Sequence, residues 1–214
     1  MIFSRRQAVL ICGPSDSGKT LLFSKMLNKT MVETFTSMKE NIGVLNVPKN
    51  RKIIDLPGHE RIRYKCLDQQ KDSAMGIIYL LDASTISKQI RDTTEFLFRI
   101  LSDPAIHSNK TPVLVICNKQ DMTLNKSASV IERELAKEIG VLRETHAKIL
   151  QGTDGSTDNH IFLGKPRKDF SFADLKVPVD FCHLIFDGRL LRSLIFQEIK
   201  SGGLFHQNSV YNMV

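Results

Sequence analysis

The chain has 214 residues, of which 42% are hydrophobic and 25% charged, a composition typical of one soluble globular domain that excludes collagen, coiled coil and wholesale disorder. Lys and Arg outnumber Asp and Glu by 30 to 23, and the resulting charge of +7 suits an acidic partner such as nucleic acid or an anionic membrane surface. Solubility alone also explains such a charge.

Neither export nor a membrane span is expected from the sequence. The longest run without charged or strongly polar residues, Ala74–Leu81, is far shorter than the roughly 18–20 apolar residues of a membrane helix. Met1–Phe3 is followed closely by Arg5, so the apolar core of a signal peptide is missing. No two of the four cysteines have CxxC spacing, which favours reduced core residues over a zinc site or disulfides.

Apolar runs that end at Gly, Pro, Asp or Asn predict strands, and apolar stripes at i, i+4 spacing predict helices. The predicted strands are Ala8–Cys12, Lys52–Leu56, Gly76–Leu81, Val113–Cys117 and Val177–Cys182. The predicted helices are Lys19–Asn28, Ile90–Ser102 and Ser127–Leu150, with Pro104 closing the second. The alternating elements and near-continuously hydrophobic strands predict a doubly wound α/β domain whose parallel sheet is covered on both faces.

A single domain is predicted to span residues 1–214, with one interruption of this alternation. The Gly/Ser/Thr/Asp-rich stretch that opens residues 151–169 predicts a flexible insertion. Its basic cluster, Lys165, Arg167 and Lys168, suits a contact with phosphate or an acidic protein, but a solvated loop is the favoured interpretation.

Gly13–Thr20 reads GPSDSGKT and fits the phosphate-loop pattern G-x-x-x-x-G-K-[ST], directly between a predicted strand and a predicted helix. Glycines let the backbone wrap a polyphosphate, and the N–H groups at the helix N-terminus supply positive charge. Lys19 is expected to reach the β- and γ-phosphates, and the Thr20 hydroxyl is expected to bind Mg²⁺. The predicted phosphate-binding residues are Gly13, Ser15, Asp16, Ser17, Gly18, Lys19, Thr20 and Gly58.

Asp55 and Gly58 form a D-x-x-G pattern at the end of the second predicted strand. An Asp in this place can hold Mg²⁺ through water, and the Gly58 N–H can bind the γ-phosphate. The pattern alone is expected about once by chance in a chain of this length, so its weight comes from its position between the phosphate loop and the next motif.

Asn118, Lys119 and Asp121 form the pattern N-K-x-D after the fourth predicted strand. The pattern fits guanine, because one carboxylate can accept hydrogen bonds from both N1–H and the exocyclic amino group, whereas adenine has no such donor pair. Lys119 can lay its methylenes over the purine. Three motifs in this order, each after a predicted strand, predict a domain that binds GTP or GDP together with Mg²⁺.

These motifs resemble the Ras-like superfamily of small GTPases over about residues 8–182. Within it, they are most similar to the family of signal recognition particle receptor beta subunits. The similarity lies in Asp16–Phe23, in Asp55–Glu60 with its Pro57, in Asn118–Asp121 and in Lys126–Ala128. The resemblance implies an α/β P-loop GTPase fold (a G domain), with a mostly parallel central sheet and helices on both faces.

The resemblance also implies roles for individual residues. His59 stands where Ras-like enzymes have a Gln that orients the attacking water, so His59 is a candidate catalytic residue. A role in switch conformation alone is equally open. Thr36 is the implied switch I ligand of Mg²⁺, with Thr30 and Thr34 as alternatives.

The family has a Ser-Ala pair after its last strand whose backbone contacts the guanine, and by the resemblance this pair would fall at His183-Leu184, directly behind Cys182. Cys182 and His183 are therefore the implied guanine-binding residues of this segment. The segment 183–214 otherwise diverges from the family, although Leu190–Lys200 has the pattern of a closing helix. The family also carries an N-terminal transmembrane anchor, whereas seven residues precede the first predicted strand here, which suggests a truncated start.

By this resemblance the chain is the GTP-switched subunit that binds the receptor alpha subunit in co-translational targeting of proteins to the endoplasmic reticulum. The ribosome is a further implied partner, and direct DNA binding is not expected. Membrane association is expected through a missing N-terminal anchor or through the partner, at the cytosolic face of the endoplasmic reticulum.

Weak, partner-dependent hydrolysis of GTP to GDP is expected, because the sequence has no identifiable arginine finger. Arg61 and Arg63 lie close to the second motif, but they are interpreted as partner-facing or solvated. An Arf- or Ras-like trafficking GTPase is the alternative function. A translation-type GTPase that binds RNA or the ribosome, and an inactive scaffold, are less favoured.

Overall fold

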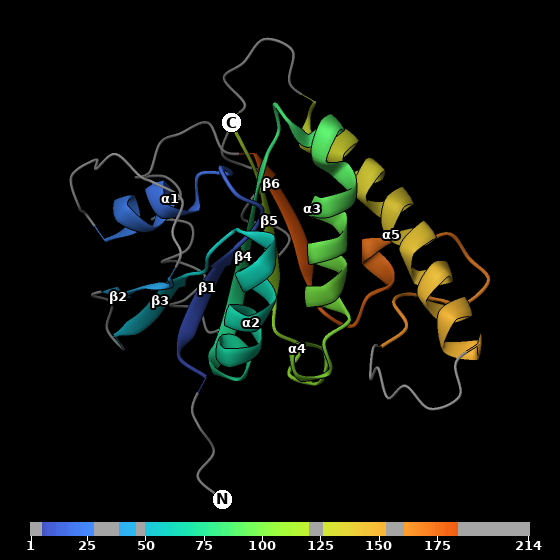
Figure 1. Ribbon diagram of the computed structural model, residues 1–214, viewed down its shortest axis with the longest axis horizontal. Helices are drawn as coiled ribbons and strands as arrows, with labels where there is room; N and C mark the ends of the chain where they lie inside the picture. Colours follow the sequence, from blue (N-terminus) through green and yellow to red (C-terminus); the bar gives the residue numbers. More distant parts are fainter. Residues whose placement is uncertain (1–5, 28–38, 46–49, 120–125, 153–160, 184–214) are drawn as a thin grey trace, which may run out of the picture.

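The computed structural model describes residues 6–27, 39–45, 50–119, 126–152 and 161–183. Its strands form one sheet in the order β2-β3-β1-β4-β5-β6 (Figure 1). The strands are β1 (Ala8–Cys12), β2 (Asn41–Leu45), β3 (Arg51–Asp55), β4 (Ala74–Asp82), β5 (Val113–Asn118) and β6 (Val179–His183). β2 is antiparallel to β3, and the other neighbouring strands are parallel.

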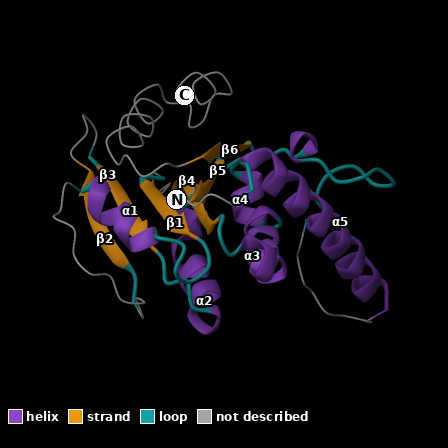
Figure 2. Ribbon diagram, turned by 90° about the horizontal axis from the view of Figure 1, so that it is seen from above, coloured by secondary structure: helices purple, strands orange, loops and turns teal. Residues whose placement is uncertain are grey.

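Helices cover both faces of the sheet. They are α1 (Lys19–Met26), α2 (Glu60–Gln70), α3 (Ile86–Leu101), α4 (Pro104–Ser108) and α5 (Ala128–Gly152), with the 3-10 helices η1 (Lys71–Ser73) and η2 (Phe172–Asp174). The strands lie between α1 on one side and α3 and α5 on the other (Figures 1 and 2). Val9 and Ile11 of β1 share one core cluster with residues of α1, whereas Leu10 shares the other with residues of α3 and α5. The predicted fold class is confirmed.

The elements that the sequence pattern does not predict include β2 and α2. The edge strand β2 leaves Ile42 and Val44 about half exposed, and it has a glycine at its centre, so its strand signal is weak. Helix α2, with the sequence ERIRYKCLDQQ, buries only Arg63 and Leu67. It therefore lacks the apolar stripe from which a helix is predicted.

The short helix α4 gives Pro104 a second role besides the predicted one of closing the preceding helix. Helix α3 ends at Leu101, before this proline, and Pro104 then begins α4. The Asp103 carboxylate caps α4 by accepting from the N–H groups of Ala105 (2.9 Å) and Ile106 (3.2 Å). None of the helices in the described ranges combines the length and apolar character that a bilayer span requires.

The sheet brings the three sequence motifs to one edge. Helix α4, which leads into β5, lies at the bottom of Figure 1, so the carboxyl ends of the parallel strands face the top. Gly13 follows β1, while Asp55, Asp82 and Asn118 are the last residues of β3, β4 and β5. Because parallel strands all end at this edge, motifs more than 100 residues apart in sequence meet there.

Part of the predicted insertion is described, and α5 holds that part. Residues 153–160 lie outside the described residues, as does the segment 184–214 with its predicted closing helix. Arg143 of α5 is 4% exposed and donates to the carbonyl oxygens of Leu163 and Lys165, at 3.3 Å each, and to that of Lys168. The backbone around the basic cluster is therefore anchored, while its basic side chains are exposed.

Candidate functional site

The phosphate loop has backbone conformations that require its two glycines. Gly13 has a φ of 139°, and a Cβ atom there would lie 2.0 Å from the carbonyl oxygen of Leu80 in β4. Gly18 has a φ of 96°, and a Cβ atom there would lie 2.5 Å from Nδ2 of Asn118. Both glycines permit a conformation and a close approach that larger residues do not tolerate. The motif therefore builds a loop packed tightly against β4 and β5.

Lys19 is a buried cation whose hydrogen-bond partners in the described structure are neutral. Its side chain is 7% exposed, and Nζ donates to the Pro14 carbonyl oxygen at 2.5 Å and to Ser17 Oγ at 3.5 Å. Burial lowers the pKa of Lys19 to about 8, although the negative charge of Asp55 opposes this shift. A polyanion bound in the loop would supply the missing counter-charge.

Asp55 offers an oxygen site for Mg²⁺. Its Oδ2 accepts from Thr20 Oγ1 at 2.8 Å and from Asn41 Nδ2 at 2.9 Å. Its Oδ1 is buried and has no hydrogen-bond partner within the described part of the chain. Burial raises the pKa of Asp55 even though both hydrogen bonds and Lys19 lower it. Hydroxyl and carboxylate oxygens are the ligands that Mg²⁺ prefers, so Thr20 and Asp55 fit this ion. Thr36 lies outside the described residues.

The second motif closes against the phosphate loop. Gly58 is buried, and a Cβ atom there would lie 2.6 Å from Lys19 Nζ and 2.7 Å from the Ser15 nitrogen. His59 is exposed and caps α2, where its Nδ1 accepts from the Arg61 N–H at 3.3 Å. His59 also lines a cleft of about 1030 Å³ between the phosphate loop and the starts of α2 and α3, a wall of which is formed by Asp16.

Arg63 corrects an expectation from the sequence, because it is neither partner-facing nor solvated. It is 2% exposed, and its Nη1 and Nη2 donate to the two carboxylate oxygens of Asp92 in α3 at 3.0 Å and 2.5 Å. Burial lowers the pKa of Arg63, but the hydrogen bonds to Asp92 and Tyr64 outweigh this effect and raise it overall. A guanidinium paired in this way cannot act as an arginine finger. Arg61 is exposed at the cleft.

The guanine motif is attached to the phosphate loop by Asn118. This side chain is 1% exposed, and its Nδ2 donates to the carbonyl oxygen of Ser17 at 2.8 Å. Lys119 has a φ of 60°, and its Nζ lies 2.8 Å from Oδ2 of Asp82 at the end of β4. Burial raises the pKa of Asp82, but the hydrogen bonds from Lys119 and Ser84 lower it overall. Asp121 lies outside the described residues.

The last strand places the two remaining candidates beside this motif. In the parallel pair of β5 and β6, Cys182 pairs with Ile116, and His183 pairs with Cys117. Cys182 is 8% exposed and belongs to the core cluster on the α1 side, where burial raises its pKa to about 11. Its side chain therefore serves the core. The backbone at His183 ends β6 next to the strand that carries Asn118.

Three residues that contribute to the site were not singled out from the sequence: Asn41, Asp82 and Asp92. Asp82 carried a signal, because it is a carboxylate that ends an apolar strand at the same edge as the motifs. Asn41 and Asp92 carried none, since their contacts are with Asp55 and Arg63, which are 14 and 29 residues away in sequence.

Comparisons with known proteins agree with this geometry. The sequence profile of the family described as signal recognition particle receptor beta subunit matches residues 4–179. The signal recognition particle receptor subunit beta of Mus musculus is 37% identical over 182 residues, which cover 83% of this chain and 68% of the relative. The protein of that name from Saccharomyces cerevisiae is 27% identical over 204 residues, or 91% of this chain and 82% of the relative.

Solved structures show the same likeness. The structure of the mammalian SRP receptor superposes with a TM-score of 0.72 at 35% identity, covering 83% of this chain and 90% of that chain. The SRb-GTP/SRX complex from Chaetomium thermophilum superposes with a TM-score of 0.67 at 23% identity, covering 87% of this chain and 98% of that chain. At 23% identity, the likeness to the Chaetomium thermophilum complex shows the fold alone.

Proposed function

Because the chain belongs to the family of signal recognition particle receptor beta subunits, we propose that it binds GTP and GDP with Mg²⁺ and works as the GTP-switched module of such a receptor. The observation that carries this proposal is the convergence of Lys19, Asp55 and Asn118 on one glycine-dependent loop. Within the described residues, the Lys19 ammonium has no anionic hydrogen-bond partner and Oδ1 of Asp55 has no hydrogen-bond partner at all. A phosphate–Mg²⁺ ligand would satisfy both groups.

In this proposal, the backbone N–H groups of Gly13–Thr20 and the Lys19 ammonium bind the phosphates. Thr20 and Asp55 hold Mg²⁺, together with Thr36, and the ion neutralises charge on the β- and γ-phosphates. The Asp121 carboxylate accepts hydrogen bonds from the guanine. Lys119 covers the purine face, and the backbone after β6 completes the base pocket.

His59 is proposed to orient the attacking water. Support comes from its place directly after Gly58, whose backbone lies against Lys19 and Ser15, and from its position on the cleft beside the phosphate loop. Its Nδ1 already caps α2, so the second ring nitrogen is the one available to a water molecule. Hydrolysis is expected to be slow and partner-dependent.

The proposed partner is the receptor alpha subunit, which the GTP-bound form would recognise through the segments around Thr36 and His59. The name of the Chaetomium thermophilum complex, in which the beta subunit carries GTP and is bound to SRX, supports this assignment. We place the protein at the cytosolic face of the endoplasmic reticulum, associated with the membrane and near the ribosome. An alpha subunit captured equally well by the GDP-bound and GTP-bound forms would contradict the switch.

The decisive test compares the binding of GTP, GDP and ATP by the purified chain. We expect both guanine nucleotides to bind at least roughly 100-fold more tightly than ATP, because a site built around purine donors rejects a base that lacks them. Asp121→Asn should abolish this preference, and Asp72→Asn, an exposed change in η1, should preserve it. Equal binding of ATP, or binding of neither nucleotide, would overturn the proposal.

A further inference from the structure

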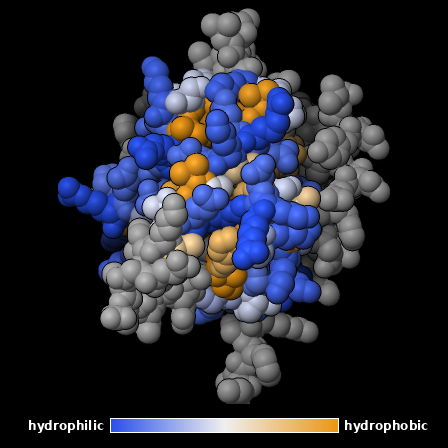
Figure 3. Space-filling view, turned by 90° about the vertical axis from the view of Figure 1, so that its right-hand side faces the viewer, coloured by the Kyte–Doolittle hydropathy of each residue, from blue (hydrophilic) through white to orange (hydrophobic). Residues whose placement is uncertain are grey.

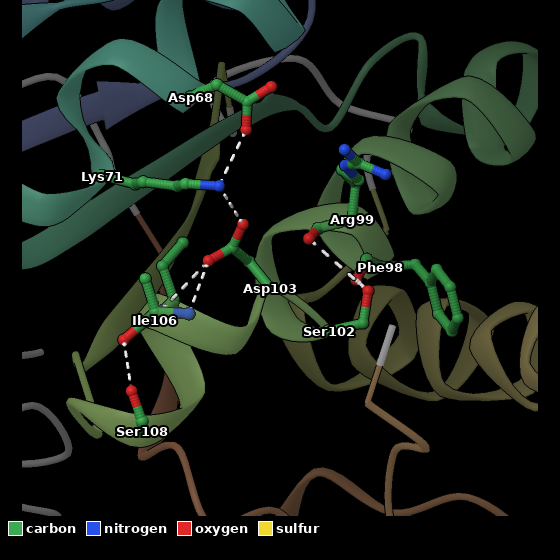
Figure 4. Close-up of polar contacts among 9 residues, drawn as sticks. Asp68, Lys71, Phe98, Arg99, Ser102, Asp103, Ile106 and Ser108 are labelled. Carbon is green, nitrogen blue, oxygen red and sulfur yellow. Dashed lines mark hydrogen bonds and ion pairs between the residues drawn. The ribbon is translucent and has the colours of Figure 1, made fainter. Parts of the chain in front are cut away.

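Helix α2 contacts the core through Leu67 and the partly buried Tyr64 and Cys66, whereas Ile62 in its first turn is not part of the core cluster. Of its eleven residues, only Arg63 and Leu67 are buried. Its far end is held separately, because Lys71 lies 3.0 Å from Asp68 and 2.8 Å from Asp103 (Figure 4). The position of the first turn, which follows His59, therefore depends largely on Arg63.

Both outer nitrogens of Arg63 make directional hydrogen bonds, while its buried Nε has no hydrogen-bond partner within the described residues. Besides the two hydrogen bonds to Asp92, Nη2 donates to the Tyr64 hydroxyl at 3.1 Å. The centre of the guanidinium lies 4.9 Å from the Tyr64 ring centroid and 4.7 Å from that of Phe96. These two rings meet edge to face, with centroids 5.5 Å apart. A bidentate pair between aromatic rings fixes both the distance and the orientation of α2 relative to α3.

Helix α3 is a rigid reference for this contact. Phe96, Leu97 and Ile100 are fully buried against the sheet. The hydroxyl of Tyr79 in β4 also donates to the Thr93 carbonyl oxygen at 2.6 Å, one residue after Asp92. Asp92 is therefore held by the core, and it transmits that position to Arg63.

The face that α3 and α5 turn outward is largely hydrophilic, with small separate apolar spots (Figure 3).

Arg63 is one hydrogen bond away from His59. The Arg63 N–H and the Ile62 N–H both donate to the His59 carbonyl oxygen at 3.0 Å. His59 and Asp92 line the same cleft, and Gly58 joins His59 directly to the backbone beside Lys19. A shift of the first turn of α2 would thus move His59 relative to the phosphate loop.

We propose that Arg63 and Asp92 are a positioning pair that holds the first turn of α2, and with it His59, in the geometry that orients the attacking water. Neither side chain touches the nucleotide in this scheme. The inference rests on the proposed function for its catalytic part, because it assumes GTP hydrolysis at this site. Its structural part, the hold on α2, does not depend on nucleotide.

The test is Asp92→Asn, which keeps the shape of the side chain but removes its charge. We expect single-turnover GTP hydrolysis to slow by roughly 10-fold, since misplacing a reacting group by about 1 Å has effects of this order or larger. The dissociation constants for GTP and GDP should change by less than about threefold. Glu95→Gln, an exposed change of the same charge one turn further along α3, should leave all three values unchanged.

A double-mutant cycle separates positioning through His59 from a general loss of structure. In the His59→Ala background, Asp92→Asn should cause no further loss of hydrolysis rate, because the residue it positions is absent. Tyr64→Phe, which removes one acceptor without removing a charge, should give a smaller loss that also disappears in that background. A full loss with Asp92→Asn in the His59→Ala protein, or no loss in the parent protein, overturns the inference.

Hydrogen exchange tests the hold on α2 without nucleotide. Asp92→Asn should speed exchange of the Ile62 and Arg63 amides, and Glu95→Gln should not. Unchanged protection of these amides contradicts the positioning pair even if nucleotide binds as proposed. Failure of the wild-type chain to bind GTP contradicts the proposed function instead, so the two failures are distinguishable.

Discussion

Two arginines in the described part of the chain are almost completely buried, and their surroundings differ. Arg63 is 2% exposed and is neutralised by a carboxylate from another helix, whereas the 4% exposed Arg143 donates to backbone carbonyl oxygens of the segment 163–168. A carboxylate partner makes the position of one element depend on another, because the buried guanidinium is unfavourable without its counter-charge. Neutral carbonyl partners, in contrast, fix the backbone of a loop against the helix that carries the arginine. The first arrangement suits a helix that carries a functional group, and the second suits a structural connection.

Lys19 is a third buried cation and extends this comparison. Like Arg143, it donates only to neutral oxygens among the described residues, in its case a carbonyl and a hydroxyl oxygen. Burial lowers the pKa of Lys19 to about 8. In the proposed function, the phosphates of the bound nucleotide supply the counter-charge of Lys19. The buried charge of Arg63 is thus balanced by a carboxylate on another helix, and that of Arg143 is solvated by backbone carbonyl oxygens of a loop. The charge of Lys19 is balanced, in the proposed function, by a bound nucleotide.

The largest effect is expected from removing the carboxylate of the first pair. Asp92→Ala should lower the free energy of unfolding by about 3–5 kcal/mol, because it leaves the buried Arg63 charge without its counter-ion. Arg63→Met should cost less, roughly 1–2 kcal/mol, since the Asp92 side chain is 34% exposed and can be hydrated once alone. Urea unfolding of both variants measures the difference. An equal or larger loss for Arg63→Met would mean that Asp92 is not the essential counter-ion.

Replacing Arg143 should cause a smaller loss of stability and should leave nucleotide binding unchanged. Arg143→Met should lower the free energy of unfolding by about 2 kcal/mol, because it leaves three carbonyl oxygens without their donor, including that of the buried Leu163. Arg143→Lys should not restore stability, since an ammonium cannot reproduce the planar fork that reaches several oxygens. Unfolding midpoints and GTP dissociation constants are the measurements. Weaker GTP binding in either variant would contradict a purely structural role.

The pH dependence of Lys19 should be visible in the nucleotide-free protein. Its folded pKa of about 8 lies below its ordinary value of 10.5, so the unfolded chain binds more protons between these values and stability rises with pH there. The free energy of unfolding should rise by about 1 kcal/mol between pH 8 and pH 9, and by only about 0.3 kcal/mol between pH 7 and pH 8. Lys19→Met should remove this rise. Unfolding of both proteins at pH 7, 8 and 9 measures it, and identical pH profiles would contradict the assignment.

The local parts of the fold and site could be predicted from the sequence, and the long-range parts could not. Glycine spacing around Lys19 predicted the phosphate loop, because the loop conformation depends on residues within the motif. The strands could also be predicted locally, because a strand buried on both faces of a parallel sheet is itself a continuous run of apolar residues. Burial of Arg63 was missed because arginine is normally exposed, and its partner Asp92 is brought close only by the packing of α2 against α3.

The smallest effect is expected at Arg167, which lies on the loop that Arg143 holds but takes no part in that anchoring. Its side chain is exposed and its φ is 61°, a left-handed conformation that glycine adopts without a steric penalty. Arg167→Gly should therefore raise the free energy of unfolding by a few tenths of a kcal/mol, despite the loss of a charged side chain. A loss of 1 kcal/mol or more in urea unfolding would show that this exposed charge supports the loop. Stability would then depend on the surface cations as well as on the buried ones, and the contrast with Arg143 would fail.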